Sequence, residues 1–121
     1  MATVDSTLTA AMAIEGATAV ALVDFDSGMT LGSAGGGMDL DLAAAGNTDV
    51  VRAKFRTLQS LGLQDGIEDI LITLTTQLHL IRLLQSANGQ GLFLYLVLDR
   101  SRANLAMARR QLLNLERELA I

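Results

Sequence analysis

One stretch of this chain changes from a strand pattern to a helix pattern within a few residues. Residues 92–98 read Leu-Phe-Leu-Tyr-Leu-Val-Leu, an unbroken apolar run between Gly91 and Asp99. The run is rich in residues that suit a pleated surface, and it is much shorter than the ~20 residues of a membrane-spanning helix. It therefore predicts a central strand that is covered on both faces of its sheet.

The residues after this strand follow a helical period instead. Apolar side chains recur there at spacings of three and four, namely Leu105, Ala108, Leu112, Leu115 and Leu119. Asp99 or Ser101 is expected to cap this helix, because either side chain can accept hydrogen bonds from its first N–H groups. A strand that leads so directly into a helix predicts that the helix folds back over the sheet.

The composition of the chain excludes several classes of protein. The 121 residues suit one domain, expected over residues 1–121, and half of them are hydrophobic. The lack of cysteine excludes disulfides and thiolate metal sites and favours a cytoplasmic location. The net charge of −4 argues against nucleic acid, whose binding needs a basic face. Neither a signal peptide nor membrane insertion is expected, because no basic start precedes an apolar run and no apolar run is long enough.

Turn residues divide the first third of the chain into a helix and a hairpin. The expected elements are a helix over 5–15, a strand over 17–25, a turn over 26–28, a returning strand over 29–33 and a flexible glycine joint over 35–37. Asp5 or Ser6 is placed to cap the helix, and Gly16 is placed to end it after about Glu15.

A long helix is expected from Asp39 or Asp41 to about Ser60, ending near Gly62. One apolar stripe along it comprises Leu40, Ala44, Asn47, Val51, Phe55 and Leu58. A second stripe comprises Ala43, Gly46, Val50 and Ala53. Together they are wider than one contact with a sheet needs. Either the helix is buried deeply within its own domain, or one stripe lies on the sheet and the other on a partner.

The second half of the chain predicts three strands before the final helix. Residues 68–74 and 78–84 are dense in β-forming residues on either side of a polar turn at 75–77. Asn88 and Gly89 are expected in the hairpin loop that leads to the central strand. Because the hairpins imply antiparallel pairing, we expect an α+β fold with one five-stranded antiparallel sheet and helices on both faces.

No arrangement of residues in the sequence predicts a catalytic or metal site, and we expect neither an enzyme nor a bound cofactor. The three glycines at 35–37 lack the Lys-Ser/Thr that completes a phosphate-binding loop. His79 is the only histidine and has no cysteine with which to hold a metal, so a structural or surface role is expected. Turn and cap chemistry accounts for the clustered aspartates Asp24, Asp26, Asp39 and Asp41.

Residues 98–109 read Leu-Asp-Arg-Ser-Arg-Ala-Asn-Leu-Ala-Met-Ala-Arg. This run resembles the strand-to-helix motif that closes the domain of the roadblock/dynein light chain family, in its bacterial, MglB-like form. Residues 15–24 resemble the first helix-to-strand joint of that family, and residues 26–31 resemble its first hairpin. The resemblance spans nearly the whole chain. One departure is Glu15, which stands where the family often carries a proline before the glycine.

The resemblance implies a roadblock/profilin-like fold, no catalytic centre, and a homodimer in which the long helices pair and the third strands join two sheets. The residues that we expect at this interface are Ala43, Gly46, Val50, Ala53, Ile70, Leu71, Ile72 and Thr73. The resemblance also implies a small Ras-like GTPase as partner, with a sensor kinase system as a further candidate. Arg52, Lys54 and Arg56 are the residues expected to contact that partner.

Three functions are open from the sequence. The first is a non-catalytic homodimeric regulator or adaptor of a small Ras-like GTPase in bacterial signalling, and this is our hypothesis. The second is a structural scaffold subunit of a complex without a GTPase. The third is a ligand-sensing module or enzyme with a pocket beneath the long helix, but the sequence lacks convergent polar residues for it.

Overall fold

The apolar run at residues 92–98 forms β5, the middle strand of a five-stranded sheet. The computed structural model describes residues 2–85 and 89–120. In chain order the elements are α1 (Val4–Met12), β1 (Ala17–Asp24), β2 (Thr30–Gly35), α2 (Leu40–Ser60), β3 (Asp69–Thr73), β4 (Gln77–Leu83), β5 (Leu92–Asp99) and α3 (Leu105–Glu118). Asn88 of the expected hairpin loop lies outside the described residues.

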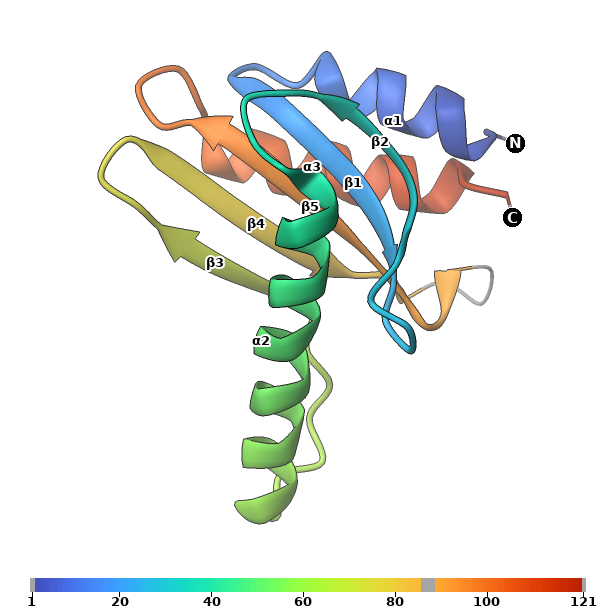
Figure 1. Ribbon diagram of the computed structural model, residues 1–121, viewed down its shortest axis with the longest axis vertical. Helices are drawn as coiled ribbons and strands as arrows, with labels where there is room; N and C mark the ends of the chain where they lie inside the picture. Colours follow the sequence, from blue (N-terminus) through green and yellow to red (C-terminus); the bar gives the residue numbers. More distant parts are fainter. Residues whose placement is uncertain (1, 86–88, 121) are drawn as a thin grey trace.

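The sheet is antiparallel throughout, with the strand order β2-β1-β5-β4-β3. Helices α1 and α3 lie side by side on one face, and α2 crosses the other face (Figure 1). The predicted α+β fold, with its order of elements and helices on both faces, is therefore confirmed. The order leaves β2 and β3 at the two edges of the sheet.

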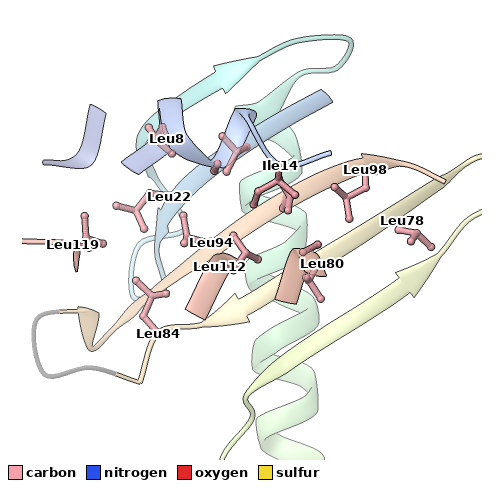
Figure 2. Packing of buried hydrophobic residues seen from close by; sticks show 14 residues of the cluster. Leu8, Ile14, Leu22, Leu78, Leu80, Leu84, Leu94, Leu98, Leu112 and Leu119 are labelled. Carbon is pink, nitrogen blue, oxygen red and sulfur yellow. The ribbon is translucent and has the colours of Figure 1, made fainter. Parts of the chain in front are cut away.

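The alternate residues of β5 belong to two different cores, which is why the whole strand is apolar. Leu94 and Leu98 lie in the core beneath α1 and α3 (Figure 2), and Leu96 belongs to the same core. Those facing α2 are Phe93, Tyr95 and Val97. Each of these side chains is at most 1% exposed. Full burial of one large apolar side chain stabilises a fold by about 1.5–3 kcal/mol.

The helix caps expected from the sequence are correct for α2 and wrong for the other two helices. Asp39 caps α2, since its side chain accepts a hydrogen bond from the N–H of Leu42. Asp99 and Ser101 do not cap α3, because they bond to each other: the N–H and hydroxyl of Ser101 both donate to the Asp99 carboxylate. The cap of α3 is Asn104, which lies after that turn.

The first helix also differs from the expectation at both ends. Its cap is Thr3 rather than Asp5 or Ser6, and it ends at Met12 instead of about Glu15. Gly16 follows a further turn and has a φ of +88°, a conformation that favours glycine. A β-carbon there would lie 3.1 Å from the backbone of Ala103, so this position also needs a residue without a side chain.

Gly35 is part of β2 and not of a flexible joint, so the returning strand runs two residues further than expected. Gly35 pairs with Ala19 of β1 and has a φ of +81°. A β-carbon at Gly35 would lie 2.3 Å from the carbonyl oxygen of Thr18. Glycine is required here because the backbones of β1 and β2 approach so closely.

We expect Gly35→Ala to lower the free energy of unfolding by about 1–3 kcal/mol, because the methyl group forces the two strands apart. Urea denaturation followed by circular dichroism measures this loss. Gly36→Ala is the matched control, since a β-carbon at Gly36 meets no atom within 4 Å. Equal stability of the two variants would contradict this explanation.

Candidate interaction surface

Helix α2 uses its first apolar stripe to cover the sheet. Ala44 and Val51 are fully buried, while Leu40, Phe55 and Leu58 are partly buried against the same core. Arg52 and Phe25 extend this contact at the β1–β2 turn, where the two aromatic rings of Phe25 and Phe55 meet edge to face, 5.8 Å apart. The apolar side chains of the first stripe are therefore covered by residues of the same chain.

The second stripe of α2 lacks such cover except at Ala43, which packs against the same core. Gly46, Val50 and Ala53 are exposed and Ala43 is half-buried, and Val50 keeps 40% of its surface. A β-carbon at Gly46 would meet no atom within 4 Å. Of the two arrangements open from the sequence, deep burial of both stripes within the domain is therefore wrong for the described chain.

An apolar groove of about 570 Å³ lies between this second stripe and the edge of the sheet. Its lining residues come from α2, from the segment that enters β3 and from the start of β3 itself, and they are Val50, Ala53, Lys54, Thr57, Ile67, Asp69 and Ile70. Figure 1 shows β3 and the start of β4 beside α2, whereas the end of β4 passes behind the helix. Apolar side chains of α2 and of the edge strand β3 are therefore both exposed to solvent in this groove.

The edge strand β3 presents unpaired backbone groups along this groove. The Leu83 N–H donates to the Glu68 carbonyl, and the Leu74 N–H donates to the Gln77 carbonyl. Because hydrogen-bonded positions alternate in an antiparallel pair, the backbone groups at positions 69, 71 and 73 point away from β4. Among the residues that the structure describes, no strand pairs with them. An edge of this kind is a template for pairing with another strand.

The side chains of β3 divide between the two faces of the sheet. Ile70 and Ile72 pack against the core on the α2 face, whereas Leu71 packs against the core beneath α1 and α3. Asp69 forms a bidentate ion pair with Arg109 of α3, with N–O distances of 2.9 and 3.1 Å. The edge strand is thus held from both sides while its outer backbone stays open.

The three cations expected to contact a partner do not form one patch. One Arg52 nitrogen donates to the carbonyls of Phe25 and Asp26, so this guanidinium braces the β1–β2 turn. Arg56 is exposed and lies four residues further on, hence on the same side of α2. Lys54 lies on the other side of the helix and lines the groove.

A polar cluster within this face was not predicted from the sequence. The two nitrogens of His79 lie 2.8 Å from the Gln77 side-chain oxygen and 2.9 Å from the Tyr95 hydroxyl. Burial lowers the pKa of His79 and raises the pKa of Tyr95, so both side chains are neutral at pH 7. The alternation within each strand shows which face a residue takes, but the register that brings these residues together was needed to find the cluster.

Across residues 2–85 and 89–120, no three histidine, cysteine, aspartate or glutamate side chains are grouped so that they could hold a metal ion. Within the same residues, none of the helices combines the length and the apolar character needed to cross a membrane.

An antiparallel five-stranded sheet with one long helix on one face and the two terminal helices on the other defines a roadblock/profilin-like α+β domain. No protein-family model and no curated protein matches the sequence. Solved structures do match. A Roadblock/LC7 domain from Streptomyces avermitilis superimposes with a TM-score of 0.81 at 16% identity, covering 97% of this chain and 94% of that one.

Two further structures belong to MglB proteins. MglB of Myxococcus xanthus gives a TM-score of 0.74 at 18% identity, covering 93% of this chain and 84% of that one. A structure described as MglB with tetrameric arrangement gives a TM-score of 0.68 at 17% identity, covering 93% and 86%. The chain therefore has the roadblock/LC7 fold, in the form seen in MglB.

Proposed function

We propose that this chain is a non-catalytic, homodimeric regulator or adaptor of a small Ras-like GTPase in the bacterial cytoplasm. The observation that carries the proposal is the open edge of β3 beside an uncovered apolar groove. The roadblock/LC7 fold and the resemblance of residues 98–109 support it. A fold neighbour described as a tetramer shows that this fold is compatible with assembly.

A second copy of the chain is the occupant that fits both features at once. Two β3 strands that pair antiparallel about a two-fold axis satisfy each other's outward backbone groups. Full overlap of the five-residue strand places Leu71 opposite its copy and Asp69 opposite Thr73. This register keeps the two Asp69 carboxylates apart, since like charges directly opposite each other destabilise a pair.

The second copy also covers the groove. Pairing of the edge strands brings the second α2 alongside the first, so that the two exposed stripes face each other. Gly46 and Ala53 are small, which lets two helix backbones approach closely. Val50 of each copy is then removed from water, and burial of apolar surface contributes roughly 25 cal/mol per Å².

The GTPase is proposed to bind the paired helices through its switch loops. Those loops are ordered by the γ-phosphate and Mg²⁺ and are released after hydrolysis. A rigid partner distinguishes the two states only if its contacts with them differ. Arg56 is exposed on α2 and is free to meet acidic or polar switch residues, whereas Arg52 is engaged at the β1–β2 turn. No arginine is proposed as a catalytic finger, so any acceleration would come from positioning the GTPase's own residues.

We expect the dimer to bind the small GTPase encoded nearest to it in the same genome with affinities that differ about tenfold between nucleotide states. Titration calorimetry with the GTPase loaded with GDP or with a non-hydrolysable GTP analogue measures the difference. Arg56→Glu should weaken binding to the preferred state about tenfold. Arg110→Glu is the matched control, because Arg110 is exposed on α3 at the opposite face.

The results of this titration separate the proposed function from its alternative. Equal affinities for the two nucleotide states would contradict a role in sensing the state of the GTPase. The chain would then be an adaptor that binds the GTPase in either state. If no small GTPase of the source organism binds, the structural scaffold subunit becomes the better description.

A further inference from the structure

His79 and Tyr95 are titratable groups that are hydrogen-bonded to each other on the face where the proposed dimer forms. The His79 ring meets the Tyr95 ring edge to face, with centroids 5.4 Å apart. An amide oxygen only accepts hydrogen bonds, so the nitrogen that faces Gln77, Nε2, carries a proton. In the neutral ring Nδ1 is then an acceptor, and the Tyr95 hydroxyl donates to it. The neutral imidazole thus completes both hydrogen bonds, whereas a charged ring keeps them only if the Tyr95 hydroxyl turns and accepts from Nδ1.

The position of His79 places it at the uncovered part of the face. It is half-buried on β4 and pairs with Ile72 of the edge strand. Helix α2 covers the end of β4 and leaves the β3–β4 turn uncovered (Figure 1). His79 is the third residue of β4 after this turn and is only half-buried, so solvent still reaches the ring in the single chain. A second copy that pairs along β3 would bring its own apolar stripe over this region and exclude that solvent.

The surrounding elements offer no charge that would hold a protonated ring. The charged or titratable groups of α2 and its cap, of the segment that enters β3, and of β3, β4 and β5 are, besides His79, Asp39, Asp41, Asp49, Arg52, Lys54, Arg56, Asp65, Glu68, Asp69, Arg82, Tyr95 and Asp99. Among the described residues, none of them forms an ion pair with His79. Asp39 accepts from the Leu42 N–H, and Asp99 accepts from Ser101. The side chains of β3 on the same face of the sheet as His79 are the isoleucines Ile70 and Ile72.

We propose that His79 makes self-association sensitive to protons, so that the second copy binds the neutral imidazole and is released when the ring becomes charged. This inference rests on the homodimer of the proposed function. A charged ring has N–H groups on both nitrogens, so Nδ1 no longer accepts from Tyr95. In the single chain the hydroxyl can turn to the Met38 sulfur, 3.6 Å away, and water solvates the charge. In the dimer that charge would be buried beneath apolar side chains, which is strongly unfavourable in free energy because the charge loses its solvation.

The sign of the effect follows from proton linkage. Burial already lowers the pKa of His79 in the single chain, and further burial in the dimer lowers it more. The dimer then binds fewer protons than two free chains, so association is strongest above the pKa of the free chain. It weakens as the pH falls through that value, and two histidines per dimer double the dependence.

Because His79 is the only histidine of the chain, its imidazole proton resonances can be titrated without ambiguity. We expect the pKa from NMR to be lower in samples concentrated enough to dimerise than in dilute ones. Sedimentation equilibrium should show the dimer dissociation constant rising about tenfold or more from about pH 8 to about pH 5.5. His79→Gln, which can donate and accept but cannot become charged, should dimerise with little change over the same range.

The outcomes separate the proton linkage from the homodimer on which it rests. A dimer whose dissociation constant does not change with pH would overturn the proton linkage and leave the dimer intact. The same pH dependence in His79→Gln as in the natural chain would also overturn it, since another group would then be responsible. A chain that is monomeric at every pH would overturn both the linkage and the proposed homodimer.

Discussion

Glu116→Ala should lower the free energy of unfolding by about 3–5 kcal/mol, because it leaves the guanidinium of Arg82, whose side chain is only 12% exposed, without its carboxylate partner. Glu116 is 3% exposed, and its carboxylate lies 2.9 Å from the Arg82 Nε. The second carboxylate oxygen accepts from the backbone N–H of Gln85, at 2.6 Å. One side chain of α3 thus holds both the end of β4 and the segment that follows it. Urea denaturation measures the loss.

Two further variants separate the ion pair from the helix that carries it. Glu118→Ala changes an exposed residue of the same helix and should alter stability by no more than about 0.5 kcal/mol. Replacing both partners by apolar residues, as Arg82→Met with Glu116→Leu, should recover much of the loss, because no unpaired charge is left behind. A loss below about 1 kcal/mol for Glu116→Ala would show that the carboxylate does not stabilise the fold in this way.

Gly46→Leu should have opposite effects on the single chain and on the dimer. The single chain has open space at this position, and replacing a glycine within α2 should stabilise the helix by roughly 0.5–1 kcal/mol. In the proposed dimer the same side chain would be forced between paired helices. Overpacking costs about 1–3 kcal/mol at each site. With two sites per dimer, self-association should weaken by at least tenfold.

Sedimentation equilibrium measures the association and urea denaturation measures the stability of the fold. Ala45→Leu is the matched control, because Ala45 is exposed on a different side of α2. It should leave self-association unchanged. If Gly46→Leu dimerises as tightly as the natural chain, the second stripe of α2 lies outside the interface, and the edge of β3 would have to carry the contact without it.

The sequence by itself determined the elements and the class of the fold. A run such as residues 92–98 is apolar at every position, and only a strand with cores on both faces makes use of that pattern. The helical spacing after Asn104 and the glycines between the strands are likewise local signals. The Asp39 cap could also be predicted, because a single side chain next to the first turn accepts a hydrogen bond from one of its N–H groups.

The sequence could not show whether a residue that is able to cap a helix forms a turn instead. Asp99 and Ser101 have the chemistry of a helix cap, yet the chain between β5 and α3 needs a turn first, and their hydrogen bonds form that turn. The same is true of Gly35, whose neighbours suggest a flexible joint. Only its pairing with Ala19 shows that a close approach of two strands requires it.

The tertiary structure alone decided which distant residues meet. The pairs Arg82–Glu116 and Asp69–Arg109, and the contact of His79 with Tyr95, depend on strand register and on where α3 crosses the sheet. Neither quantity is encoded in local spacing, because a shift of one residue moves every side chain to the other face.

The two stripes of α2 show the same division. Their existence follows from helical periodicity, so the sequence predicted both. Which stripe is buried depends on the position of α2, which places Ala44 and Val51 against the sheet and leaves Gly46 and Val50 in solvent. The sequence therefore determined that this helix has more apolar surface than its own sheet can cover, and the tertiary packing decided which part of it stays open.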